Sequence, residues 1–274
     1  MKIKLIATDL DGTFLGNDHE TIPQENIVAF EKAHKMGAII VVASGRTKVL
    51  TDDIIKQIPF ADYLITSNGA CTYDLKTNEL IFSELMDNNQ TLEIFKVLDK
   101  FGLPYEIYYD GDCFIDKENY KQYTPQNIPA VFFKVLGSKL KVIDSLPKKI
   151  ENNPVEKINI MRVTPECRLD LIRAIHSTGE IHTASAIPVN MEVNSVNANK
   201  GYAIKKLSQK LNIERQEIMA FGDGENDCEM LEFAGISFAM GNGSDYAKNS
   251  AKFIADDSDK CGVAKAVLEY ALGE

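Results

Sequence analysis

Four short segments constrain what this chain can fold into more than any other feature, because each places charged or small polar residues beside an apolar run. The segments are Asp9 to Thr13, Ser44 to Arg46, Asn199 to Gly201 and Gly222 to Asp227. Open α/β sheets bind ligands in the crevice outside the carboxyl ends of their parallel strands. The repeated layout therefore predicts an α/β fold with a parallel sheet and one site assembled from distant parts of the chain.

The first segment places two carboxylates at the end of a predicted strand. The run from Ile3 to Thr8 is apolar-rich and of strand length, so Asp9 and Asp11 follow at its carboxyl end. The two-residue period of a strand directs both side chains the same way. Two carboxylates at such an edge suit a hard cation, although an ordinary turn with Gly12 at positive φ is the alternative for this segment alone.

The second segment predicts an anion site at the start of a helix. Ser44 ends the buried run Ala38 to Ala43, and Gly45 and Arg46 open a helix expected to continue to Gln57. A hydroxyl group and free backbone N–H groups at a helix start can bind an anion. A serine that only caps the helix has the same pattern and remains an alternative.

Lys200 in the third segment lies at the start of another predicted helix. The apolar stripe of that helix consists of Ala203, Ile204, Leu207 and Leu211. The helix dipole disfavours a cation in the first turn, so Lys200 is misplaced there unless it faces an anion. A solvated surface lysine is the alternative for this segment alone.

The fourth segment concentrates oxygen-bearing side chains after a strand-like run. That run extends from Glu217 to Phe221, and the side chains are those of Asp223, Glu225, Asn226 and Asp227. Like charges this close repel one another unless a cation or a helix N-terminus compensates them. The helix expected from Cys228 to Ala234 supplies only the second, so a bound metal is the simpler explanation.

In this order the four segments resemble the motifs of the haloacid dehalogenase superfamily of phosphohydrolases, and most closely those of its Cof-type sugar-phosphatase branch. The branch follows from where an extra domain fits. The stretch between Asp9 and Ser44 has room only for a flap, a helix and a strand, whereas the stretch between Arg46 and Lys200 is long. The resemblance implies a Rossmann-like parallel-sheet core from residues 1–83 and 189–274, with an inserted α/β cap over residues 84–188 that determines substrate specificity.

The resemblance also implies an activity, namely the Mg²⁺-dependent hydrolysis of small phosphate monoesters. It assigns Asp9 as the nucleophile that forms an aspartyl phosphate, Asp11 as the acid and base, and Lys200 as the cation that steadies the nucleophile and the transferred group. The implied Mg²⁺ ligands are Asp9, the backbone carbonyl of Asp11 and Asp223, with Asn226 and Asp227 as nearby support. The implied contacts to phosphate or substrate are Gly12, Ser44, Gly45, Arg46, Asn68, Lys200 and Asn226.

Asn68 follows another predicted core strand, Tyr63 to Thr66. It resembles the Asn-Gly-Ala turn of the family, whose asparagine faces the substrate. A type I′ hairpin turn before Cys71 explains the same residues. Its role is therefore open between these two interpretations.

His19 is the one histidine whose position in the sequence, shortly after the first motif, could bring it near a substrate. A surface imidazole is the simpler interpretation. The aromatic residues of the expected cap lie at strand spacing, which favours packing of a sheet against helices over stacking on a ligand.

Composition excludes several classes of partner. A net charge of −10 and a pI near 5.0 disfavour nucleic acid, whose phosphates demand basic patches. No run approaches eighteen apolar residues and the N-terminus leads directly into a strand, so we expect no membrane segment and a cytoplasmic protein. Five cysteines without metal-ligand spacing argue for reduced structural thiols rather than zinc.

A small phosphorylated metabolite is therefore the expected partner. Two other functions stay open: a phosphomutase that returns the phosphoryl group to a sugar, and a non-catalytic protein that binds phosphorylated metabolites. The short gap between Asp9 and Ser44 argues against the mutases that carry a cap there, and the intact acidic residues argue against a binding protein. The sequence indicates neither which ester is the substrate nor the oligomeric state.

Overall fold

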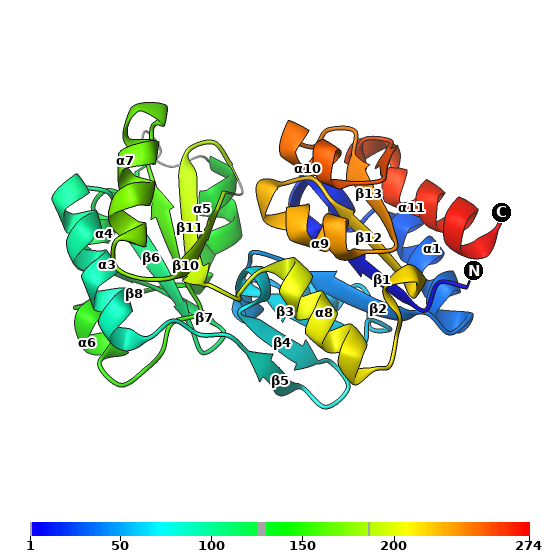
Figure 1. Ribbon diagram of the computed structural model, residues 1–274, viewed down its shortest axis with the longest axis horizontal. Coiled ribbons are helices and arrows are strands. Elements are labelled where there is room, and N and C mark those ends of the chain that lie inside the picture. Colours follow the sequence, from blue (N-terminus) through cyan, green and yellow to red (C-terminus); the bar gives the residue numbers. More distant parts are fainter. Residues whose placement is uncertain (1, 125–129, 186) are drawn as a thin grey trace. The chain divides into compact units, whose positions relative to one another are not determined.

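The computed structural model describes residues 2–124, 130–185 and 187–274, which form two compact units (Figure 1). The first unit combines the chain up to Gly45 with Thr51–Ser83 and Asn199–Glu274. The second unit consists of Arg46–Leu50 and Glu84–Ala198. An α/β core that is interrupted by an inserted α/β unit is therefore confirmed.

Among the described residues, the first unit contains an eight-stranded sheet in the order β14-β13-β12-β1-β2-β3-β4-β5. Its strands are β1 (Leu5–Thr8), β2 (Ile39–Ala43), β3 (Tyr63–Thr66), β4 (Cys71–Asp74), β5 (Glu79–Ser83), β12 (Ile218–Gly222), β13 (Ile236–Met240) and β14 (Phe253–Ala255). The six strands from β14 to β3 run parallel, and β4 and β5 continue the sheet antiparallel. The parallel part brings the expected strand ends to one edge.

Helices pack on both faces of this sheet. They are α1 (Gln24–Lys35), α2 (Asp52–Ile55), α8 (Lys200–Lys210), α9 (Cys228–Phe233), α10 (Asp245–Ser250) and α11 (Gly262–Ala266). One core joins alternate residues of β1, β2 and β12 to the apolar sides of α8, α9 and α10. The other face carries Phe221 and Phe238, and the Phe238 ring lies 5.0 Å from Tyr270 of the C-terminal helical turn. Each face of the sheet is thus covered by its own helices (Figure 1).

The second unit contains a six-stranded sheet in the order β10-β11-β9-β6-β7-β8, counted over the described residues. Its strands are β6 (Tyr105–Tyr109), β7 (Asp112–Asp116), β8 (Leu140–Ile143), β9 (Lys157–Met161), β10 (Ile181–Ala184) and β11 (Asn190–Ser195). Its helices are α3 (Asn88–Phe101), α4 (Lys117–Tyr120), α5 (Ala130–Leu136), α6 (Leu146–Ile150) and α7 (Pro165–His176). Most of these strand pairs are antiparallel.

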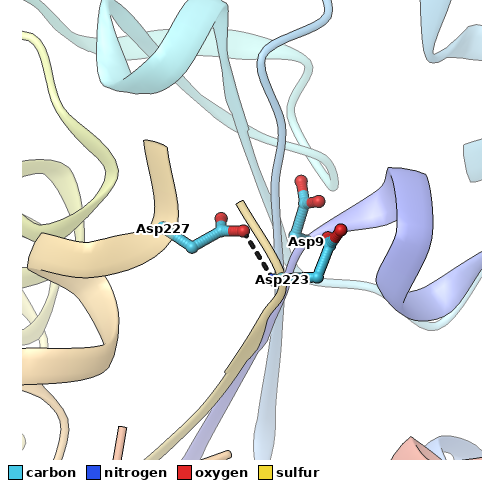
Figure 2. Close-up of side chains that lie close together, drawn as sticks. All are labelled: Asp9, Asp223 and Asp227. Atoms are coloured by element: carbon cyan, nitrogen blue, oxygen red, sulfur yellow. Dashed lines mark hydrogen bonds between the residues drawn. The ribbon is translucent and has the colours of Figure 1, made fainter. Parts of the chain in front are cut away.

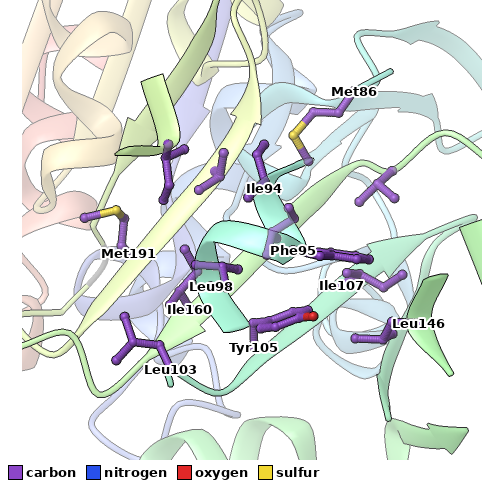
Figure 3. Close-up of a cluster of buried hydrophobic side chains, with 14 of the residues drawn as sticks. Met86, Ile94, Phe95, Leu98, Leu103, Tyr105, Ile107, Leu146, Ile160 and Met191 are labelled. Carbon is purple, nitrogen blue, oxygen red and sulfur yellow. The ribbon is translucent and has the colours of Figure 1, made fainter. Parts of the chain in front are cut away.

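Local signals explain why α3 forms the core of this unit. Asp87 accepts hydrogen bonds from the first backbone N–H groups of α3, and Gly102 ends the helix in the left-handed conformation. Between them Ile94, Phe95 and Leu98 form a buried stripe that packs on β6 and β9 (Figure 3). This apolar core is separate from that of the first unit.

Two expectations about boundaries were wrong. The second unit ends at Ala198 rather than residue 188, because β11 pairs with β9 and β10 of the second sheet. The helix expected from Gly45 to Gln57 is broken into a helical turn at Lys48–Leu50 and the short α2. The N–H of Val49 instead donates to the carbonyl of Gly111 in the second unit, at 2.8 Å.

The longest helix in the described part of the chain, α3, has 14 residues. No described helix is long and apolar enough to cross a membrane.

One face of the second sheet carries buried polar side chains beside a small apolar cluster. Asn159 lies opposite both Glu106 and Glu192 in the strand register, and its Nδ2 donates to Glu106 Oε1 at 2.6 Å. Lys157 Nζ contacts Glu192 Oε1 at 2.5 Å. Burial raises the pKa of Glu106 to about 8, although the Asn159 hydrogen bond and the Lys157 charge act in the opposite direction. Glu106 is therefore mostly a neutral acid at pH 7.

This raised pKa predicts how stability depends on pH. Glu106 has an ordinary pKa of 4.5 and a pKa of about 8 in the folded state. Between these two pH values it keeps a proton in the folded state that it loses in the unfolded chain. Its contribution to stability is thus complete below pH 4.5 and is lost as the pH rises toward 8, by at most about 1.4 kcal/mol per pH unit. Glu106→Gln removes this loss, so the urea midpoint of the variant should exceed that of the wild type at pH 8.5 but not at pH 5.

Far-UV circular dichroism is the suitable probe for this measurement, because the chain has no tryptophan. Glu151→Gln, at an exposed position in the same unit, is the control and should follow the wild type at every pH. A Glu106→Gln midpoint that shifts with pH as the wild-type midpoint does would contradict the assignment.

Candidate active site

The ends of four parallel strands bring the predicted motifs to one edge of the first sheet. Thr8 at the end of β1 pairs with β12 on one side and β2 on the other. The N–H of Asp9 continues this ladder and donates to Phe221 O at 3.0 Å. The N–H of Ser44, just after β2, donates to Ile65 O of β3 at 2.9 Å. The backbone of the first and second motifs is therefore held by the strand beside each.

Lys200 is the buried cation of the site. It begins α8, whose N-cap Asn199 accepts a hydrogen bond from Tyr202 N at 2.7 Å. Its Nζ lies 2.6 Å from Asp9 Oδ1 and 2.6 Å from Asp227 Oδ1, and the side chain is fully buried. Burial lowers the pKa of Lys200, but the charges of Asp227 and Asp9 together raise it above its ordinary value. Lys200 therefore stays protonated, and the solvated-lysine alternative is wrong.

Both oxygens of Asp227 are engaged by donors of the protein. Its Oδ2 accepts the backbone N–H of Asp223 at 2.8 Å (Figure 2). Oδ2 also accepts the N–H of Gly224 at 2.9 Å, while Oδ1 contacts Lys200. This arrangement fixes the turn after β12 and orients Lys200. Asp227 is thus placed to support the site.

Asp9, Asp223 and Asp227 each offer an oxygen, and these oxygens lie within 4.8 Å of one another (Figure 2). Burial raises the pKa of Asp9 above its ordinary range, an effect that Lys200 opposes and the neighbouring carboxylates enhance. Burial, followed by the charge of Asp227, also raises the pKa of Asp223 to about 7. Lys200 touches Asp9 and Asp227 but leaves Asp223 short of compensating charge. Hard carboxylate oxygens with unbalanced negative charge fit Mg²⁺.

Asn68 and Asn226 connect two further strand ends. Asn226 Nδ2 donates to Asn68 Oδ1 at 3.1 Å, and the N–H of Asn68 donates to Ser44 O at 3.1 Å. Asn68 has a φ of 61° in the turn that joins β3 to the antiparallel β4. The residue therefore belongs to a hairpin, as one interpretation expected, and its side chain also reaches a residue of the fourth motif.

The structure places Arg46, a predicted site residue, in the second unit. Gly45 ends a stretch of the first unit, and Arg46 begins the first stretch of the second. The guanidinium Nη1 of Arg46 donates to Leu50 O at 3.5 Å within that unit. Its assignment to phosphate binding remains a prediction.

Two polar residues of the site had no predicted role. Thr13 Oγ1 donates to Asp223 Oδ1 at 2.9 Å and so joins the first motif to the fourth. Asn242 follows β13, and its Nδ2 donates to the carbonyl of Gly12 at 2.8 Å. The signal for Asn242 was present, because a polar turn follows this strand as it follows the others. Thr13 lies in the first motif, but its role could not be predicted because its partner is distant in sequence.

Gly12 brings the first motif close to Asp223. It has a φ of 73°, and a Cβ added there would lie 2.3 Å from Asp223 Oδ2. An alanine would therefore meet both an unfavourable backbone conformation and the carboxylate itself. Gly12 is required for close approach.

A family model for haloacid dehalogenase-like hydrolases matches residues 6–267. The chain is similar to a 5-amino-6-(5-phospho-D-ribitylamino)uracil phosphatase of Bacillus subtilis, YcsE, with 28% identity over 98% of this chain and 96% of that protein. It is 29% identical to the phosphatase YwpJ of the same organism, over 96% of this chain and 98% of the relative.

Solved structures agree with this result. A haloacid dehalogenase-like hydrolase from B. subtilis superposes with a TM-score of 0.85 at 27% identity, over 98% of this chain and all of that one. The subclass IIB sugar phosphatase BT4131 shares the fold, with a TM-score of 0.85 at 23% identity over 98% of this chain and 99% of that one.

The chain belongs to the haloacid dehalogenase-like hydrolase family, in its Cof-type branch, as the motifs predicted. Within this family it is a phosphoric monoester hydrolase.

The contact of Gly12 with Asp223 predicts that Gly12→Ala lowers kcat/KM by at least about 10-fold, the equivalent of ~1.4 kcal/mol. Gly16→Ala is the matched control, because a Cβ at Gly16 would meet no atom closer than 3.5 Å. In Gly12→Ala alone, the rate of phosphate release should fall and the affinity for Mg²⁺, measured by calorimetry, should decrease. Equal effects of the two substitutions would contradict the close-approach argument.

Proposed function

We propose that this protein is a Mg²⁺-dependent phosphatase that hydrolyses small phosphate monoesters through an aspartyl phosphate on Asp9. One observation carries the proposal. A buried carboxylate at the end of β1 is held at 2.6 Å by a buried ammonium group, and a further carboxylate, Asp223, lies beside it. A nucleophile that must attack an anionic phosphoryl group needs this kind of local cation.

In the first half of the reaction an oxygen of Asp9 attacks phosphorus, and the bond from phosphorus to the alcohol oxygen breaks in line with it. Asp11 gives its proton to the departing oxygen, which leaves as the neutral alcohol. Lys200 orients Asp9 and stabilises negative charge on the transferred group. The product is an aspartyl phosphate.

In the second half Asp11, now a carboxylate, takes a proton from a water molecule. The water oxygen attacks phosphorus, the bond to Asp9 breaks, and inorganic phosphate leaves. Asp9 returns as a carboxylate and Asp11 as an acid, so atoms and charges balance over the cycle. Ser44 and backbone N–H groups at the same sheet edge are proposed to bind the phosphoryl oxygens.

The residues fit a divalent cation. Asp9, Asp223 and the backbone carbonyl of Asp11 would hold Mg²⁺, with Asn226 and Asp227 in support, because the oxygens of Asp227 already accept from Lys200 and the backbone. When bound, the ion would supply charge neutralisation at the phosphoryl group. Gly12 contributes through its close approach to Asp223.

The substrate class follows from the phosphatase relatives. One of them is named for the phosphate ester of a ribitylamino-pyrimidine, and we infer a small phosphorylated metabolite here. We propose that the second unit selects the ester and that the protein acts in the cytoplasm. Arg46 and Asn68 are proposed to contribute contacts to the phosphate or the substrate.

Two alternatives predict different products. A phosphomutase would return the phosphoryl group to a sugar, and a binding protein would transfer nothing. The second unit is inserted after Ser44 and not between Asp9 and Ser44, which favours the hydrolase. Steady release of inorganic phosphate from a panel of phosphorylated metabolites, ranked by kcat/KM, separates the three functions.

The metal proposal predicts that excess EDTA abolishes activity and that Mg²⁺ restores it. Ca²⁺ should not restore it, because its looser coordination places the attacking oxygen less well. Asp223→Asn should require at least about tenfold more Mg²⁺ for the half-maximal rate, because loss of a metal ligand, or of a residue that orients one, lowers metal affinity by this amount or more. Asp245→Asn, an exposed position of the same unit, should require no more than the wild type. Full activity in chelator would refute the assignment.

The two carboxylates of the first motif have different proposed roles, so their substitution should have different effects. Asp9→Asn removes the nucleophile, so the rate should fall by at least about 10⁴-fold and no phosphoenzyme should form. Asp11→Asn removes the acid and base, typically worth 10²–10⁴-fold, but p-nitrophenyl phosphate should still phosphorylate Asp9 and the enzyme should then stall. Acid quenching with a search for protein-bound phosphate tests both. A phosphoenzyme in Asp9→Asn, or wild-type turnover in Asp11→Asn, would overturn the roles.

A further inference from the structure

The turn after the first motif holds His19 in an unusual backbone conformation. Gly16 N donates to Thr21 O at 2.8 Å, and His19 N donates to Gly16 O at 3.0 Å. Asp18 Oδ1 accepts the N–H groups of Glu20 and Thr21, at 3.0 and 2.9 Å. Within this turn His19 has a φ of 60°, in the left-handed region that costs most side chains about 1–2 kcal/mol. Four hydrogen bonds donated by backbone N–H groups therefore fix the position of the His19 backbone.

The imidazole reaches the carboxyl group of Asp11. His19 Nδ1 lies 2.8 Å from Asp11 Oδ1, within hydrogen-bond distance. The two side chains are 32% and 38% exposed, so neither is packed in a core. His19 also lines a cavity of about 240 Å³, together with Gly12, Gly16 and Asn242. Shortening His19 therefore leaves no buried gap.

A carboxyl group that delivers a proton must present one oxygen to the departing atom. Asp11 has two rotatable bonds, and a hydrogen bond to one oxygen restricts both of them. With Oδ1 held, Oδ2 carries the proton in a defined direction. Orientation of this kind contributes to catalysis because the entropy cost of aligning the reacting groups is not incurred during the reaction step.

We propose that His19 is a positioning residue whose Nδ1–H donates to Asp11 Oδ1 and thereby aims the other oxygen of Asp11 at the leaving group. The proposal rests on the function proposed above, in which Asp11 is the acid. It assigns a role to a residue outside the four motifs. No bond to phosphorus involves His19, and it acts only through Asp11.

The role predicts an effect that grows with the basicity of the leaving group. Suitable probes are p-nitrophenyl, phenyl and benzyl phosphates, which are similar in shape but have progressively more basic leaving-group oxygens. For each of them kcat/KM reports the steps through the first transfer. His19→Gly should lower kcat/KM for benzyl phosphate at least about 10-fold, a part of the 10²–10⁴-fold that an acid supplies, and change p-nitrophenyl phosphate less than about 2-fold.

Matched variants separate the side chain from the backbone. Glycine accepts the φ of 60° without strain but donates no hydrogen bond from a side chain. His19→Asn also tolerates this conformation and places an N–H donor where Nδ1 lies, so it should stay within about 3-fold of the wild type for every ester. In an Asp11→Asn background, His19→Gly should cause no further loss in single-turnover rate.

Three results would overturn the inference: an equal loss for all three esters, a loss that persists in the Asp11→Asn background, or no rescue by His19→Asn. Each would assign His19 to the stability of the turn or to no role. If the wild type released no phosphate from any of the esters in Mg²⁺, the proposed function itself would fall, and this inference with it.

Discussion

The buried ammonium group of Lys200 is the interaction on which the rest of the site depends. It contacts Asp9 and Asp227 at 2.6 Å each, and all three side chains are buried. Removing one partner of a buried ion pair typically costs about 3–5 kcal/mol, because the remaining charge is left without compensation. The start of α8, the end of β1 and the turn after β12 are therefore tied to one point, although they are far apart in sequence.

This charge balance also gives the acidic residues different contacts and roles. Lys200 compensates Asp9 and Asp227, and Asp227 uses its second oxygen to hold the turn that carries Asp223. Burial, and after it the charge of Asp227, raises the pKa of Asp223 to about 7, although Thr13 and Lys200 act in the opposite direction. A buried acidic residue that is only partly compensated favours a bound cation over a solvated acidic turn, and Gly12 is the residue that leaves room for its carboxylate beside the first motif.

The two units differ in where their sheets place polar side chains. The sheet of the first unit is apolar on both faces and keeps its polar groups at the strand ends. The second sheet packs α3 and α7 on one face, and its other face buries polar side chains, such as Glu106 and Asn159, beside a small apolar cluster. Hydrogen bonds across the strands make that polar face possible, since an unpaired buried carboxylate would be costly. A neutral Glu106 reduces this cost further.

The sequence by itself determined the α/β core, the place of the insertion and the residues of the four motifs, because a strand followed by a polar turn is a local signal. Only the tertiary structure decided what those residues touch. The contact of Thr13 with Asp223, the engagement of both Asp227 oxygens and the pairing of β11 with the second sheet join segments that are distant in the chain. Hydrogen-bond partners and strand register depend on where other elements pack, and no local pattern encodes them.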